Sequence, residues 1–116
     1  MEKDQLIFRI TRLIRAIEES SGLDAMDLSA RAILNFVGEA EARKQLLNVS
    51  DVVRGPGFGT PPTVYSRIAE LEHAGWIRCV PDPEDGRAKH VRLTPQAHRA
   101  FSRMSAATRK LIAAKG

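Results

Sequence analysis

The chain has little cysteine, few aromatic residues and no long apolar run. Its one cysteine, Cys79, excludes an internal disulfide and a cysteine-rich metal site, and suits a reducing compartment. The longest apolar runs are only a few residues, and charged residues follow Met1. Neither a transmembrane helix nor a signal peptide is therefore predicted. We expect a soluble protein of the cytoplasm.

Patterns of catalytic and metal-binding residues are also missing. His73, His90 and His98 are not four residues apart on one helix and have no carboxylate or thiol companions in a ligand pattern. No nucleophile elbow, phosphate-binding loop or paired-carboxylate motif occurs. Cys79 is either a small strand residue, which we favour, or a redox sensor, which needs an exposed, stabilised thiolate. We predict no metal, no cofactor and no enzymatic activity.

The composition is that of one globular domain with a basic surface. The chain has 116 residues, of which 43% are hydrophobic and 28% are charged, enough for a modest core. Its 18 Lys and Arg against 14 Asp and Glu give a net charge of +4. Eight of these basic residues and only three acidic ones lie between positions 78 and 110. This distribution favours a polyanionic partner.

The stretch 60–77 organises the chain because it predicts a capped helix with two different faces. Thr60 is an N-cap, Pro61 occupies the first helical position, and Gly75 ends the helix in a left-handed conformation. The apolar residues are four and three positions apart and form one stripe. They are Val64, Ile68 and Leu71.

Polar residues in the first turns of this helix, about 61–74, suit the major groove of DNA. Arg67 can bind guanine through two hydrogen bonds, and Thr63 or Ser66 can touch a phosphate or a thymine methyl group. Tyr65 either joins them in contacting DNA or is partly buried against a neighbouring helix. Arg67 has the alternative of a solvated charge.

Two amphipathic helices precede this stretch. The first covers 3–20, is closed by Ser20, Ser21 and Gly22, and serves either as a dimer contact or as a cover for the domain's own core. The second begins after Ser29 as N-cap, and Gly38 leaves its end open. The apolar residues of the second helix are Ile33, Leu34, Phe36, Val37 and Ala40.

A short apolar step, a short helix and a long turn lead into the recognition stretch. Leu46 and Leu47 suggest a single strand, and a helix is expected over 51–54. The segment 55–62, GPGFGTPP, forbids regular structure, and Phe58 within it is either a plug on the core, which we favour, or an exposed tip. Two helices joined by such a glycine-containing turn make a helix-turn-helix.

After Gly75 the apolar period falls from 3.6 to about two residues. Strands over 76–80 and 89–93 and a turn over 81–87 predict a β-hairpin, in which Ile77, Val91 and Leu93 face the core. Arg78, Lys89 and Arg92 then face solvent or a ligand. Thr94 caps a final helix that starts at Pro95.

The fold class is therefore α+β, mostly α: a winged helix-turn-helix with flanking helices. We expect one domain, with a DNA-binding winged helix over 28–94. The helices over 1–22 and 95–116 are possible dimerisation segments.

The wing carries a resemblance to a known family. Asp85 and Arg87 are separated by one residue, and Val91, Leu93 and Thr94 follow them. This pattern resembles the wing signature of MarR-family transcriptional regulators. The resemblance covers roughly 28–97, and it extends to the recognition helix. The matching residues there are Thr63–Val64, Leu71–Glu72 and Gly75–Ile77.

This resemblance implies a homodimer on a pseudo-palindromic DNA site. The chain departs from the family in the inserted glycines, in Ala97 where a glycine is common, and in Ser66 where a basic residue is common. It is also short for a member. Relatives often bind small aromatic compounds, but no residue set here implies an effector.

At the wing tip we expect Arg87 to enter a minor groove, braced by Asp85 through a bidentate pair. The alternative is an exposed ion pair of little energetic value. Phosphate contacts are predicted for Arg54, Arg78 and Lys89. Together with Thr60, these complete the DNA-contact residues of a sequence-specific transcriptional regulator. A winged-helix module for protein interaction, without DNA binding, is the alternative function.

Overall fold

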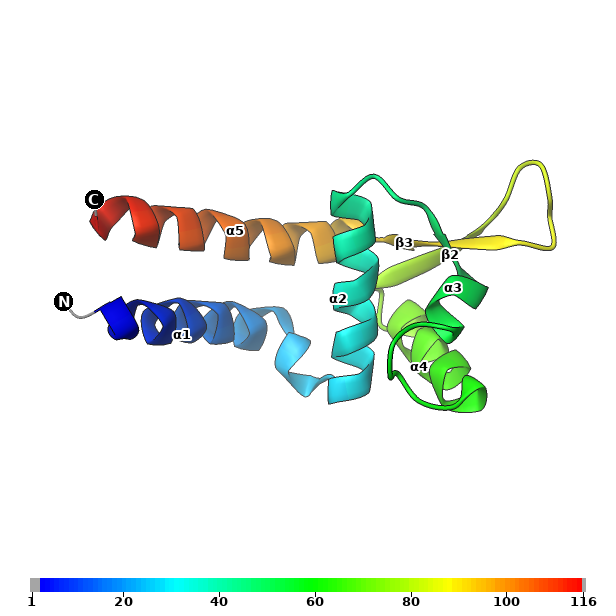
Figure 1. Cartoon of the computed structure of the whole chain (residues 1–116), viewed down its shortest axis with the longest axis horizontal. Helices are drawn as coiled ribbons and strands as arrows, with labels where there is room; N and C mark the ends of the chain where they lie inside the picture. Colours follow the sequence, from blue (N-terminus) through cyan, green and yellow to red (C-terminus); the bar gives the residue numbers. More distant parts are fainter. Residues whose placement is uncertain (1–2, 116) are drawn as a thin grey trace. The chain divides into compact units, whose positions relative to one another are not determined.

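The computed structural model describes residues 3–115 and divides them into two compact units. One unit is Asp27–Ala97, and the other joins the chain before Asp27 to the chain after Ala97. Figure 1 shows the elements along the chain. In order they are α1 (Lys3–Ser21), a 3-10 turn (Leu23–Ala25), α2 (Leu28–Ala42), β1 (Leu47–Asn48), α3 (Val49–Val53), α4 (Pro61–His73), β2 (Ile77–Pro81), β3 (Lys89–Leu93) and α5 (Pro95–Lys115).

The unit Asp27–Ala97 is a winged helix, as predicted. Its core lies between α2, α4 and the sheet, where burying each large aliphatic side chain stabilises the fold by about 1.5–3 kcal/mol. The largest fully buried side chains there are Ile33, Leu34, Val37, Val52, Val64, Leu71, Ile77 and Val91. The predicted α+β, mostly α fold class is therefore confirmed.

The sheet has three antiparallel strands in the order β1-β3-β2. Ile77 pairs with Leu93 and Cys79 with Val91, so the buried side chains alternate with exposed ones. This confirms the predicted inward face and leaves Arg78, Lys89 and Arg92 exposed. The loop after β2 carries the wing beyond the helices of this unit (Figure 1).

The start of α2 differs from the prediction. Asp27, not Ser29, is its N-cap, because Asp27 Oδ1 accepts a hydrogen bond from the Ala30 amide at 2.7 Å. Ser29 Oγ donates instead to the Phe58 carbonyl at 3.0 Å. The helix continues through Gly38 and ends at Ala42.

The short helix α3 begins two residues before the predicted 51–54. Asn48 Oδ1 accepts from the Asp51 amide at 2.9 Å, and Asp51 Oδ2 accepts from the Asn48 amide at 2.9 Å. This reciprocal capping box starts the helix directly after β1.

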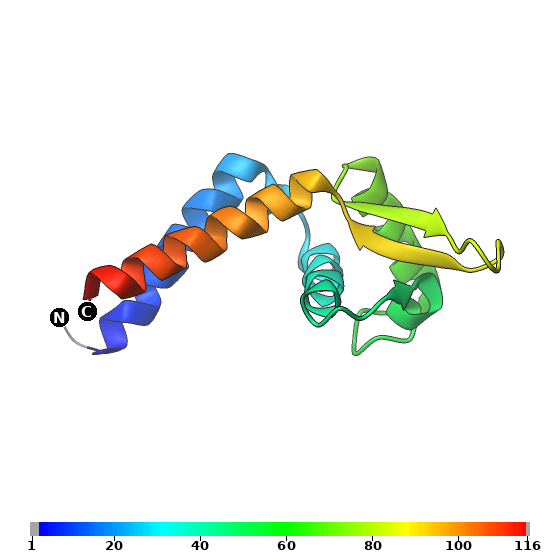
Figure 2. The ribbon, with the colours of Figure 1, turned by 90° about the horizontal axis from the view of Figure 1, so that it is seen from above.

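The second unit contains α1, the 3-10 turn and most of α5. Both long helices were predicted, and Gly22 ends α1 with a φ of 83°. Within this unit α1 and α5 run antiparallel (Figures 1 and 2), and Arg103 donates to Ser20 Oγ at 3.1 Å and to Ser21 Oγ at 3.4 Å. Thr94 Oγ1, which accepts from the Ala97 amide at 3.3 Å, is the predicted cap of α5.

Candidate nucleic-acid interface

Helix α4 is fixed on one side by the core and at its end by a glycine. Val64, Ile68 and Leu71 are buried, as the apolar stripe predicted. The Trp76 amide donates to the Leu71 carbonyl at 2.9 Å and the Gly75 amide to Glu72 at 3.1 Å. Gly75 has a φ of +85°, a left-handed conformation that disfavours any side chain.

The predicted side-chain cap by Thr60 is wrong, although Thr60 holds the N-cap position. Its hydroxyl lies 3.1 Å from the Thr63 hydroxyl and accepts no helix amide. Pro61 and Pro62 occupy the first two helical positions and have no amide proton, so the helix start has fewer unpaired donors to satisfy.

The glycine-rich turn before α4 is anchored by Phe58. This side chain is 9% exposed and meets the Phe36 ring edge-on, with ring centroids 5.3 Å apart. A Cβ on Gly55 would lie 2.5 Å from the Phe58 ring, so glycine makes room for the plug. The predicted plug is confirmed, and it ties the turn to α2.

Arg67 is held by two carboxylates. Its Nε lies 2.8 Å from Asp27 Oδ2, and its Nη1 lies 3.4 Å from Glu70 Oε2. The Arg67 side chain is only 28% exposed. The structure thus pairs Arg67 with carboxylates and does not leave it as a solvated charge, while its contact with a base stays a prediction.

Tyr65 and Ser66 are exposed on α4, and Thr63 is half-buried. Tyr65 is 53% exposed and therefore partly buried, so its two interpretations, a DNA contact and partial burial, both stay open. Tyr65 borders a groove of about 450 Å³ between α4 and the wing. The groove is lined by Asn48, Val49, Ser50, Tyr65, Ile68, Ala69, Glu72, Cys79, Arg87, Ala88 and Lys89.

The wing turn is built around two aspartates. Asp82 Oδ1 accepts from the Glu84 amide at 2.7 Å and from Asp85 at 3.3 Å, and Asp82 Oδ2 lies 2.9 Å from His90 Nε2. The Glu84 amide, and after it the Asp85 amide and His90, hold the pKa of the Asp82 carboxyl below its ordinary value. Asp85 Oδ1 accepts from the Arg87 amide at 3.1 Å.

Arg87 projects from this turn with its side chain 96% exposed. A single contact of 3.6 Å joins its Nε to Asp85 Oδ1, so the predicted bidentate brace is wrong. Asp85 organises the backbone of Arg87 through the amide and leaves the guanidinium extended. The geometry suits insertion into a narrow groove.

The structure brings some of the predicted contacts together and leaves others apart. Tyr65, Arg87 and Lys89 share the groove. Arg54 does not line it and lies 3.5 Å from Asp51 in an exposed ion pair. Arg78 is exposed one residue before Cys79, and successive strand side chains point to opposite faces, so it lies on the other face of the hairpin.

Cys79 lines the groove beside Glu72. Burial, followed by repulsion from Glu72, raises the pKa of the Cys79 thiol. A raised pKa keeps the thiol protonated at neutral pH, which favours the interpretation as a small strand residue. Glu72 Oε2 is itself engaged, since it accepts from the Cys79 amide at 3.1 Å.

Sequence reasoning did not identify Asn48, Ser50 and Ala69 as groove residues. The spacing Asn48–Asp51 of the capping box was the available signal for the first two, because it places α3 directly beside β1. Ala69 carries no polar group, and only its position on α4 reveals it.

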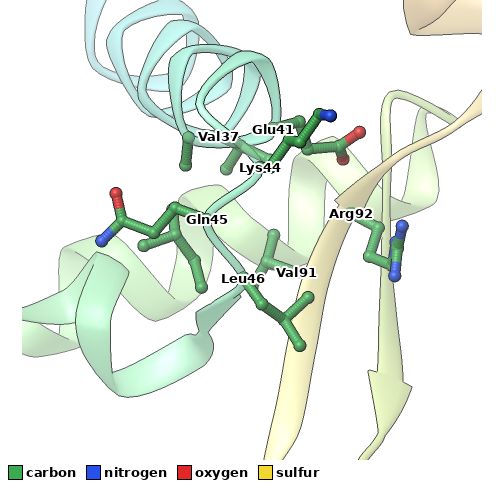
Figure 3. Close-up of a pocket in the computed structure, with 9 residues that line it drawn as sticks. Val37, Glu41, Lys44, Gln45, Leu46, Val91 and Arg92 are labelled. Atoms are coloured by element: carbon green, nitrogen blue, oxygen red, sulfur yellow. The ribbon is translucent and has the colours of Figure 1, made fainter.

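A second pocket of about 360 Å³ lies away from these residues, between the end of α2, β1 and β3. In Figure 3, Glu41 comes from the end of α2, Lys44 from the turn after it, and Val91 and Arg92 from β3. None of the predicted DNA-contact residues lines it. Across residues 3–115, no cluster of three potential metal ligands and no helix able to span a membrane is found.

Comparisons with known proteins agree with this geometry. The profile of the winged helix DNA-binding domain family matches residues 28–97, the range over which we predicted the resemblance. No curated protein sequence matches the chain. The predicted MarR-like winged helix is confirmed at the level of the fold.

Solved structures of bacterial proteins share the fold at low identity. Transcriptional regulator Tm0710 from Thermotoga maritima is 17% identical, with a TM-score of 0.64 over 94% of this chain and 71% of that chain. YusO from Bacillus subtilis is 18% identical, with a TM-score of 0.57 over 97% and 74%. A mutant of S. aureus MepR bound to an oligodeoxyribonucleotide is 16% identical, with a TM-score of 0.62 over 98% and 81%.

Proposed function

The chain belongs to the winged helix DNA-binding domain family, and we propose that it is a transcriptional regulator that binds specific sites on double-stranded DNA. The observation that carries this proposal is the shared groove, in which the exposed Tyr65 of α4 faces Arg87 and Lys89 of the wing. Helix and wing thus border one surface that has the exposed cations Arg87 and Lys89 at its rim.

Helix α4 fits the major groove in length and in the chemistry of its outer side. Its 13 residues correspond to about 20 Å of helix, and the groove of B-DNA, about 12 Å wide, admits one helix. Ser66 and Tyr65 in its first half are exposed and can hydrogen-bond. We propose that this half approaches the base edges.

The wing supplies the second contact. Arg87 is extended and nearly fully exposed, and Lys89 follows it on β3. A narrow minor groove has the most negative potential and attracts such an arginine. Lys89 then neutralises a phosphate. The alternative function, a winged-helix module that binds proteins and not DNA, is not favoured by this basic surface.

We further propose a homodimer, formed through the helices outside Asp27–Ala97. Ile7 and Phe8 on α1 are 58% and 68% exposed, and Ile112 on α5 is 51% exposed. Water-exposed apolar side chains of this size favour a partner surface. Two copies would then read half-sites about one helical turn apart in a pseudo-palindrome. Such a regulator has no catalytic role and works in the cytoplasm.

A salt-dependent binding titration tests DNA recognition. We expect fluorescence anisotropy of a labelled duplex to show affinity that falls steeply between about 50 and 200 mM salt, because bound phosphates release counterions. Arg87→Ala should weaken binding. Arg43→Ala is the matched control, because Arg43 is exposed at the end of α2 and lies outside the groove.

Absence of binding at low salt by the folded protein would refute the proposal. Equal affinities of wild type, Arg87→Ala and Lys89→Ala would do the same. Sedimentation of the free protein tests the dimer: a monomer at micromolar concentration would contradict that part alone.

A further inference from the structure

The outward side of α4 carries no free cation. Pro62, Ser66, Ala69 and His73 are four, three and four residues apart and all are exposed. This spacing places them on one strip of the helix, opposite the buried stripe of Val64, Ile68 and Leu71. We call these four residues the outer strip. Only His73 in the strip can be charged, and it lies in the last turn.

The charged residues beside the outer strip are already engaged. Arg67 lies 2.8 Å from Asp27, and Glu70 is 3.4 Å from Arg67. Glu72 accepts the Cys79 amide at 3.1 Å. No other side chain of α4 is basic or acidic except His73.

Asp27 contacts two elements at once. One carboxylate oxygen caps α2 through the Ala30 amide at 2.7 Å, and the other meets Arg67 Nε at 2.8 Å. Turning the guanidinium toward DNA would break this contact and leave a half-exposed carboxylate without its partner. Arg67 therefore joins α4 to the N-cap residue of α2 through an ion pair.

The chemistry left on the outer strip suits thymine. In the major groove guanine is read by Arg or Lys, adenine by Asn or Gln, and cytosine by a free carboxylate. The outer strip has none of these side chains. The methyl group of thymine is recognised by apolar contact, which Ala69 offers and which the Pro62 ring offers about two turns earlier. Ser66 between them can donate or accept.

We infer that α4 selects A·T base pairs by contacting thymine methyl groups with Pro62 and Ala69, and that Arg67 is a positioning residue that reads no base. This inference rests on the proposed function, because it specifies the DNA that the same surface takes. It replaces the guanine contact expected for Arg67 from the sequence.

Selection of bound duplexes from a random pool supplies the probe. The duplex recovered should be rich in A·T pairs at the centre of each half-site. A wing arginine in a minor groove also favours A·T tracts, so enrichment alone is insufficient. We therefore replace each thymine of the selected duplex by deoxyuridine, which removes only the methyl group in the major groove.

Affinity should fall about fourfold for each contacted thymine, the value expected for one buried methyl group. In the Ala69→Gly protein, replacing the thymine that Ala69 contacts by deoxyuridine should no longer weaken binding. If no deoxyuridine substitution weakens binding of the wild type, the inference is wrong. Circular dichroism of the Ala69→Gly protein verifies that it remains folded. If Ala69→Gly unfolds the protein, the same test is made with Ala69→Ser.

Two further variants distinguish a residue of α4 that contacts a base from a residue that only holds the helix in place. Ser66→Arg introduces a free guanidinium on the outer strip, so the selected duplexes should gain a guanine at one position of each half-site. Arg67→Gln should weaken binding to all duplexes alike and leave the selected sequence unchanged. Guanines in the wild-type site that are lost on Arg67→Gln would overturn the inference.

These results are distinguishable from failure of the proposed function. A protein that binds no duplex at low salt refutes DNA binding itself. A protein that binds with a steep salt dependence but selects guanine through Arg67 leaves the regulator proposal intact and refutes only the A·T inference.

Discussion

Helix α4 and the wing border the same groove but are built in opposite ways. Val64 and Leu71 of α4 are 0% and 2% exposed, so apolar burial fixes the helix. The wing turn is held by hydrogen bonds to Asp82 and Asp85, and Arg87 at its tip is 96% exposed. The first element is anchored in the core and has few charges on its outer side, while the second presents Arg87 to solvent.

This difference separates two tasks of DNA binding. Contacts with phosphates position a protein and depend on salt, whereas contacts with base edges carry the sequence information. The wing has the charge for the first task. The outer strip of α4 has the fixed geometry for the second, because its backbone cannot shift without disturbing the core.

The largest expected effect is on the burial of α4. Leu71→Ala should lower the free energy of unfolding by about 2–5 kcal/mol, because it removes apolar contacts and leaves a cavity. Urea unfolding followed by circular dichroism measures this loss. Leu28→Ala is the control: Leu28 is 90% exposed, and its change should stay within about 0.5 kcal/mol. Equal losses would show that α4 is not fixed by its apolar stripe.

Charge on the wing should dominate the salt dependence. The double change Arg87→Ala and Lys89→Ala should weaken binding about tenfold at about 0.15 M salt and lower the slope of log K against log salt by about 1–2. Ala69→Ser on α4 should leave that slope unchanged while it alters the response to deoxyuridine. A slope that both variants reduce equally would erase the division between the two elements.

The pair that ties α4 to α2 should give a smaller effect. Asp27→Asn, Arg67→Gln and the double variant form a cycle, and we expect a coupling free energy of about 0.5–1 kcal/mol, since the Arg67 side chain is 28% and the Asp27 side chain 49% exposed. The asparagine side chain in Asp27→Asn retains a capping oxygen for the Ala30 amide. Strictly additive losses would show that the ion pair contributes nothing.

The smallest expected effect is the loss of stability of the wing turn at low pH. The Asp82 pKa is lowered in the folded protein, chiefly by the Glu84 amide. Its ionised form therefore stabilises the turn above the ordinary aspartate pKa of about 3.9, and this contribution is lost as the pH falls through the folded value. Carboxyl-carbon NMR should show Asp82 titrating below that ordinary value. A midpoint at or above it would contradict the role of the amide bonds, while α4 resonances should not follow this titration.

Much of the fold could be predicted from local patterns. Apolar spacing gave the helices and the hairpin, and Gly75 and Gly22 marked helix ends that only a left-handed residue completes cheaply. Ser29 and Asp27 show the limit. Both residue types cap helices, but Asp27 caps α2, and the Ser29 hydroxyl donates to the Phe58 carbonyl, 29 residues away in the chain.

The candidate site divides in the same manner. The wing motif Asp85–Arg87 is local, so its place on an exposed tip was predictable, although the single 3.6 Å contact was not. The carboxylate partner of Arg67 was not predicted, because nothing near Arg67 in sequence, apart from Glu70, indicates one. Its main carboxylate belongs to Asp27, forty residues earlier in the chain.

The sequence by itself determined that the chain is a winged helix, where its recognition helix and wing lie, and that its second half is basic, because periodicity, turn residues and composition act over short distances. The tertiary structure decided which charges remain free. Packing α4 against α2 placed the Arg67 guanidinium beside the Asp27 carboxylate. The wing, in contrast, carried Arg87 away from the core and left it exposed. The physical reason is that ion pairing depends on distance in space and not on distance along the chain.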